Sequence, residues 1–177
     1  WVTDPGPNRP GGEASEKASK GPGPKPKIQR SPGAEPHGRQ LLHDMRLVKD
    51  ADEMRMLQKA CDLGVDAHLR AAALVRPEAQ EYQVEAAFGQ HARHHGSTGS
   101  GYPSICGCGP NAAVLHYISN LSGLRRKDLF LIDAGCEWGY YTSDITRTYP
   151  VGGAFSRLQR DLYELVLLAH KAAMAKV

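Results

Sequence analysis

The chain has 177 residues, of which 41% are hydrophobic and 23% charged, and its net charge is +3. This length leaves room for about one ordinary domain with a sizeable core. The sequence contains no run of roughly 18 to 20 apolar residues, so we expect no membrane span. The four cysteines do not form paired C-x-x-C motifs, which favours free thiols over a structural zinc site.

The first 40 residues differ in composition from the rest. They hold 8 of the 12 prolines and 7 of the 19 glycines, and almost no large apolar side chains. Such a segment cannot bury enough surface to offset the entropy of ordering, so we predict a disordered linker or tail over residues 1–40. It also carries the whole net charge, because the remaining residues have 15 basic and 15 acidic side chains. We therefore expect no nucleic-acid partner for the globular part. The first residue is Trp1 rather than Met, which suggests a fragment or a processed chain.

Two helices are predicted after this segment. Asp50 and Glu53 have the spacing of a capping box, and Arg76-Pro77 ends the helix that follows. A second helix is expected over residues 78–95, with Gly96 as its stop. In the first helix, apolar residues recur at steps of three and four and predict its buried face: Met54, Leu57, Cys61, Val65 and Leu69.

β-Prone runs come next, over residues 102–106 and 114–118, the second with His116 at its centre. Residues 129–148 then read as an antiparallel hairpin, with an apolar run up to Asp133, turn residues, and a second run that carries Asp144. If the turn is Trp138-Gly139, Asp133 lies directly opposite Asp144. Like charges at that distance destabilise a sheet, so the pair must raise a pKa, share a proton or hold a cation. A bulge, or a solvated turn aspartate, is the alternative.

The last predicted element is a helix. Ser156 and Gln159 have the spacing of a second capping box, and an apolar stripe follows almost to the last residue. The order is thus two helices, several antiparallel strands and a helix. It predicts an α+β fold in which helices pack on one face of an antiparallel sheet.

Several motifs resemble the catalytic domain of aminopeptidase P, in the pita-bread (creatinase/aminopeptidase) family of metallopeptidases. They lie at residues 41–49, at Leu115-His116-Tyr117, at 131–137, at 143–150 and at 155–160. The resemblance covers roughly three quarters of the chain. It implies a partial pita-bread fold over residues 41–177, which form the amino-terminal half of the catalytic domain.

The resemblance also implies an activity and a site. The family removes an N-terminal residue that precedes proline, using two manganese ions. Its two hairpin aspartates are metal ligands and match Asp133 and Asp144. Its histidine in the Leu-His-Tyr motif matches His116, which lies beside the metals and assists the substrate and the developing charge. Hard carboxylate oxygens suit manganese or magnesium better than thiolates would.

The sequence departs from the family pattern in one large respect. The remaining family ligands, one histidine and two glutamates, lie in a second half with no counterpart here. We therefore expect this polypeptide alone to bind metal weakly and to lack normal peptidase activity. A prolidase-type dipeptidase and a non-catalytic pita-bread protein-binding module stay open as alternatives. The resemblance is compatible with a homo-oligomer and with the cytoplasm or the mitochondrion as compartment.

Overall fold

The structure, a computed structural model, describes residues 38–177. The predicted disordered segment thus lies outside the described residues, except for residues 38–40. The chain divides into two compact units between residues 51 and 52. Helix α1 (Gly38–Leu47) belongs to the first unit, and no residue in it is buried.

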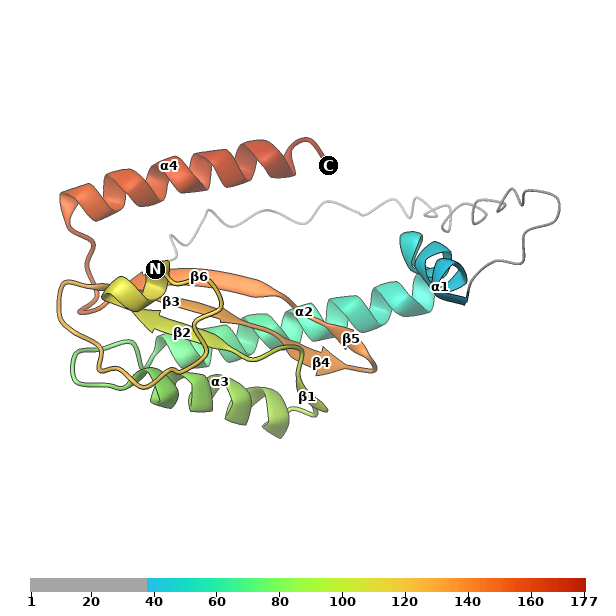
Figure 1. Ribbon diagram of the computed structural model, residues 1–177, viewed down its shortest axis with the longest axis horizontal. Helices are drawn as coiled ribbons and strands as arrows, with labels where there is room; N and C mark the ends of the chain where they lie inside the picture. The colour runs from blue at the N-terminus through green and yellow to red at the C-terminus, as the bar shows by residue number, and fades with distance from the viewer. Residues whose placement is uncertain (1–37) are drawn as a thin grey trace, which may run out of the picture. The chain divides into compact units, whose positions relative to one another are not determined.

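The second unit has the order helix, helix, strands, helix that the sequence predicts (Figure 1). The elements that follow α1 in the chain are α2 (Ala51–Ala72), α3 (Glu81–His94), β1 (Gly99–Ser100), β2 (Ile105–Cys108), a 3-10 turn η1 (Gly109–Ala113), β3 (Leu129–Ala134), β4 (Cys136–Trp138), β5 (Tyr141–Thr142), β6 (Ile145–Pro150) and α4 (Arg157–Met174). In the described part of the chain, no helix is long and apolar enough to cross a membrane.

The strands form two antiparallel three-stranded sheets, ordered β2-β3-β6 and β1-β4-β5. Strand β3 is central in the first, and alternate residues along it are buried: Phe130, Ile132 and Ala134. These side chains form one core with residues of α2 and α3, which lie on the same side of the sheet in Figure 1. Because successive side chains of a strand point to opposite faces, Leu131 and Asp133 face away from that core.

The buried face of α2 is not the predicted one. Met54, Val65 and Leu69 are exposed, and the residues that α2 buries are mostly small: Ala60, Leu63, Gly64, Ala67, His68 and Ala71. The reason is close packing. A Cβ on Gly64 would lie 2.5 Å from Oγ of Ser143, so this side of α2 approaches the strand connection too closely for large side chains. Hydrophobic periodicity finds large apolar residues and overlooks a stripe of small ones.

Of two other local predictions, the capping box of the last helix is confirmed and a strand is wrong. Ser156 accepts a hydrogen bond from the backbone N–H of Gln159, whose side chain reaches back to Ser156, so the capping box at α4 is confirmed. The predicted strand over residues 114–118 is wrong, because a turn follows η1 there and the φ of His116 is +57°. A strand residue cannot adopt that conformation.

Candidate metal and substrate site

Asp133 lies near the end of β3, on the face of the sheet opposite the helices. Its neighbours Ile132 and Ala134 are fully buried on the core side. The alternation of the strand therefore fixes the direction of the carboxylate. Across the sheet, Asp133 pairs with Thr146 of β6 rather than with Asp144.

The register differs from the predicted one because the hairpin turn is Gly139-Tyr140. Both residues have positive φ, +58° and +68°, and Trp138 pairs with Tyr141. Two-residue hairpins of this kind need positive φ at both central positions, a conformation that glycine adopts without steric cost and that is strained for a bulky residue such as Trp. The predicted Trp138-Gly139 turn would have placed a bulky Trp there. The directly opposed aspartate pair is therefore a wrong prediction.

The two carboxylates nevertheless meet. Asp144 precedes Thr146 by two residues, so the two side chains share a face, and Asp144 is the diagonal neighbour of Asp133. The phenol oxygen of Tyr102 lies 2.5 Å from Oδ1 of Asp133 and 3.0 Å from Oδ1 of Asp144. A phenol has one proton to donate. It can therefore satisfy one of the two carboxylates at a time, and a cation would satisfy both.

Tyr102 is the member of the site that sequence reasoning missed. Burial, followed by the hydrogen bonds to Asp133 and Asp144, raises the pKa of Tyr102 well above its usual value. The phenol is therefore a hydrogen-bond donor throughout the physiological range. No sequence signal could have identified it, because it lies 31 and 42 residues from the two aspartates.

Gly135 makes room for this arrangement. A Cβ at this position would lie 1.9 Å from the backbone oxygen of Ser143 and 2.8 Å from the ring of Tyr102. The N–H of Gly101 also donates to the carbonyl of Gly135, at 3.0 Å. The glycine that follows the Asp133-Ala134 dipeptide is thus required for a close backbone approach and for the placement of Tyr102.

His116 lies across a cavity from the aspartates. It is exposed, on the turn after η1, and the cavity has a volume of about 480 Å³. The structure therefore brings all three predicted site residues to one cavity, which is lined by Tyr102, Pro103, Ile105, His116, Ile118, Asp133 and Asp144.

The donor set present fits a hard divalent cation, although it is incomplete. The two carboxylates are the oxygen ligands that manganese and magnesium prefer. Within residues 38–177, however, no group of three or more His, Cys, Asp or Glu side chains could hold a metal ion. No cysteine lines this cavity, and burial raises the pKa of the thiols of Cys106, Cys108 and Cys136.

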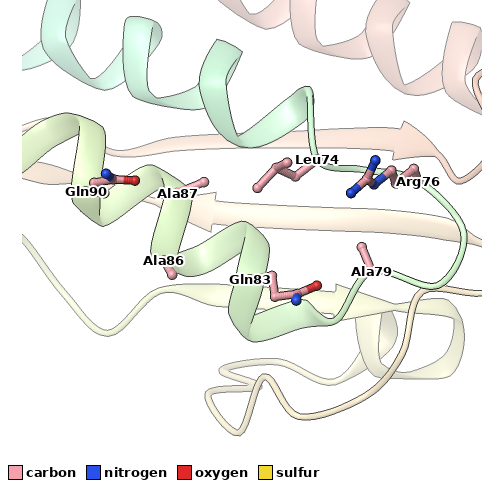
Figure 2. A pocket seen from close by; sticks show the side chains of 7 residues that line it. All are labelled: Leu74, Arg76, Ala79, Gln83, Ala86, Ala87 and Gln90. Atoms are coloured by element: carbon pink, nitrogen blue, oxygen red, sulfur yellow. The ribbon is translucent and has the colours of Figure 1, made fainter.

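A second cavity, of about 330 Å³, has a different lining (Figure 2). Leu74 and Arg76, in the connection after α2, face Ala79 and the side of α3. The remaining lining residues are Gln83, Ala86, Ala87 and Gln90. No carboxylate or imidazole lines it. It is therefore not a candidate metal site.

Comparison with known proteins agrees with this geometry. The family model described as metallopeptidase family M24 matches residues 55–177, more than two thirds of the chain. The chain belongs to metallopeptidase family M24. Its M24 region is similar to the Xaa-Pro aminopeptidase of Haemophilus influenzae, with 43% identity over 136 residues, which are 77% of this chain and 32% of that protein. The Xaa-Pro aminopeptidase of Escherichia coli is 42% identical over 73% of this chain and 29% of its own length.

Solved M24 structures confirm the predicted fold. Proline aminopeptidase P II from Yersinia pestis superimposes with a TM-score of 0.74 at 44% identity, over 75% of this chain and 30% of that one. A variant of Escherichia coli aminopeptidase P gives a TM-score of 0.73 at 40% identity. The resemblance to the pita-bread fold and to aminopeptidase P is thus confirmed. The chain spans about a third of the length of the curated relatives that it matches.

Proposed function

We propose that residues 41–177 form the amino-terminal half of the catalytic domain of an Xaa-Pro aminopeptidase. The activity is the hydrolytic release of an N-terminal residue that precedes proline. The observation that carries this proposal is the convergence of Asp133 and Asp144 on one phenol, in a cavity that His116 also lines. The names of the M24 relatives, Xaa-Pro aminopeptidases at 42–43% identity, support the substrate class.

Asp133 and Asp144 are the metal ligands of the proposed site, and two manganese ions are its cofactor. The facing carboxylates, in a cavity whose lining contains no cysteine, support hard cations over soft ones. When bound, such ions supply Lewis-acid polarisation of the scissile carbonyl and activation of a water. Tyr102 orients the two carboxylates, because its phenol bridges their oxygens.

His116 is the proposed catalytic side chain. It is exposed on a turn at the rim of the cavity, where a bound peptide would pass, and neither of its ring nitrogens is buried in the core. In this position the imidazole can hydrogen-bond a substrate carbonyl and stabilise the negative charge that develops on it.

We further propose that this polypeptide alone binds metal weakly and is inactive. The described residues bring only two carboxylates to the cavity, without a third ligand group. The resemblance assigns one histidine and two glutamates to the remaining part of the family site. Two ligands hold a cation less tightly and leave it without a fixed geometry.

Manganese binding to the purified chain tests the site. Electron paramagnetic resonance measures free Mn²⁺ during titration of the wild type, of Asp133→Asn and of Asp144→Asn. We expect weak binding to the wild type and roughly tenfold or greater loss in each variant, because each removes one of two charged ligands. Asp62→Asn, on the exposed side of α2, is the matched control and should bind as the wild type does.

Two outcomes contradict these proposals in different ways. Equal binding by the wild type and both variants would refute the metal site. Two tightly held ions together with cleavage of an Xaa-Pro peptide would support the site and refute the proposed inactivity of the isolated chain. If the chain proves active, cleavage of Xaa-Pro dipeptides in preference to longer peptides would indicate a prolidase-type activity instead.

A further inference from the structure

Glu81 is a buried carboxylate that the proposed chemistry does not use. It is the first residue of α3, and its side chain is 0% exposed, surrounded by the core that α2, α3 and the β2-β3-β6 sheet share. A buried carboxylate costs several kcal/mol unless hydrogen bonds replace its lost water. The groups that hydrogen-bond to Glu81 must therefore offset the cost of burying its carboxylate.

Four donors surround this carboxylate. Oε1 accepts from the backbone N–H of Cys108 at 2.8 Å and from Nδ2 of Asn111 at 3.0 Å. Oε2 accepts from the phenol of Tyr117 and from the backbone N–H of Ser122, both at 2.8 Å. These partners come from the end of β2, from η1 and from the loop that follows. In the sequence, these partners lie both before and after His116.

The partners of Glu81 are also bonded to one another. Nδ2 of Asn111 lies 3.0 Å from the phenol oxygen of Tyr117 and 3.0 Å from Oγ of Ser122. The phenol of Tyr117 thus donates to Glu81 and accepts from Asn111. In return, the backbone N–H of Glu81 donates to the carbonyl of Ser122 at 2.9 Å. The carboxylate is the shared acceptor of this network.

The turn that carries His116 depends on such side-chain contacts. Within the described chain, its backbone hydrogen bonds are local: Val114 donates to Asn111, and Tyr117 donates to Val114. His116 also has a φ of +57°, a region that non-glycine residues rarely occupy. A turn without ladder hydrogen bonds keeps such a conformation only if neighbouring contacts hold it. Tyr117, the residue after His116, supplies the contact to Glu81.

We propose that Glu81 is a positioning residue for His116. Its carboxylate fixes Asn111 and Tyr117, and these two residues set the place of the intervening turn at the rim of the cavity. The relevance of this positioning to catalysis rests on the proposed function of His116. The positioning itself does not, because it needs neither a metal nor a substrate.

Hydrogen exchange on the metal-free chain, measured by mass spectrometry, tests the proposal. Glu81→Gln keeps the size of the side chain. Its amide NH2 group would face N–H and O–H groups that are also donors, so some of the hydrogen bonds are lost. We expect exchange over residues 109–122 to rise by roughly tenfold or more, with exchange in β3 and β6 unchanged. Tyr117→Phe, which leaves the carboxylate in place, should raise exchange over residues 114–118 and is the informative variant if Glu81→Gln does not fold.

A matched control and a second measurement separate positioning from general stability. Glu137→Gln, in β4 of the other sheet, removes a carboxylate that accepts a hydrogen bond from Thr98, and it should leave residues 109–122 protected. The imidazole resonances of His116 in nuclear magnetic resonance spectra should move in Glu81→Gln and Tyr117→Phe and stay unchanged in Glu137→Gln. If exchange instead rises by the same factor in β3, β6 and residues 109–122, Glu81 stabilises the whole unit and the proposal is overturned. Failure of manganese to bind the wild type would refute the metal site and leave this result standing.

Discussion

Tyr102 is the residue on which the geometry of the candidate site depends most. Its single proton lies between Asp133 and Asp144, which have the same charge and face the same cavity. Gly135 is needed beside it, since a side chain there would meet the phenol ring at 2.8 Å. A hydrogen bond to a charged group contributes more than a neutral one, and a lost donor leaves the acceptor unsatisfied.

Tyr102→Phe tests this residue. We expect the free energy of unfolding to fall by roughly 1–2 kcal/mol at neutral pH, because the two carboxylates lose the donor between them. Urea denaturation monitored by circular dichroism measures the change. Tyr140→Phe is the control, since Tyr140 is 94% exposed in the hairpin turn, and it should unfold as the wild type does. Equal midpoints for Tyr102→Phe and the wild type would show that the phenol does not stabilise the pair.

At the scale of the element, the helices divide into two kinds. The buried faces of α2 and α3 pack on the sheet and include Phe88 and Val84, which are fully buried. In contrast, α4 has a well-formed capping box and an apolar stripe, but no residue of it is buried. A contiguous exposed apolar stripe favours association.

A charge substitution on α4 tests whether this stripe makes the chain associate. Leu162 and Leu165 are 55% and 64% exposed, and Leu162→Glu with Leu165→Glu places two charges on the stripe. We expect the sedimentation coefficient of the wild type to rise with concentration and that of the double variant to stay constant, because burying each leucine favours contact by about 1.5–3 kcal/mol.

The control variant makes the same change in net charge as the double leucine variant, but on the polar side of α4. Arg160→Gln with Lys171→Gln also lowers the net charge by two, and this variant should associate as the wild type does. If both double variants stay monomeric, charge repulsion explains the effect. If the wild type does not associate at all, a homo-oligomer through α4 is refuted.

At the scale of the whole molecule, His68 links α2 to the central strand. It is 3% exposed, and its Nε2 donates to the carbonyl of Ala134 at 3.1 Å. Its Nδ1 has no hydrogen-bond partner within the described residues. Burial lowers the pKa of His68, with a contribution from the positive charge of Arg147, and outweighs the hydrogen bond to Ala134, which raises it. The folded state therefore disfavours protonation of the ring.

This burial predicts a loss of stability in mild acid. The unfolded chain binds a proton at His68 with a pKa of about 6.5, and the folded chain binds it only at lower pH. The free energy of unfolding should thus be constant above about pH 6.5 and fall as the pH drops below that value toward the folded-state pKa. Urea denaturation at about pH 7.5, 6.5 and 5.5 measures the slope.

Two histidine variants test whether His68 causes the dependence of stability on pH. His68→Gln keeps an N–H for the carbonyl of Ala134 but does not titrate, so the slope should become shallower than that of the wild type; the lowered pKa of His91 leaves a remainder. His170→Gln removes an exposed histidine of α4 and should keep the slope of the wild type. The same slope in His68→Gln and the wild type would contradict the role of His68.

The sequence by itself determined the features that depend on neighbouring residues. The capping box at Ser156 and the coarse order of two helices, antiparallel strands and a last helix follow from local chemistry, although residues 114–118 form a turn and not a strand. So does the hairpin that carries Asp133 and Asp144, and the motifs around those residues were enough to indicate the family. The side chains of Asp133, Asp144 and His116 could be named in advance because they lie within such motifs.

Only the tertiary structure decided which surfaces meet. Mostly small residues of α2 face the sheet because Gly64 lies against Ser143, while Met54, Val65 and Leu69 remain exposed. Positive φ at Gly139 and Tyr140 moved the hairpin register by one position at the turn and made the aspartates diagonal neighbours. Tyr102 and Glu81 acquire their roles through contacts 27 to 42 residues away in the sequence. Such contacts follow from packing of the whole chain, which local periodicity does not encode.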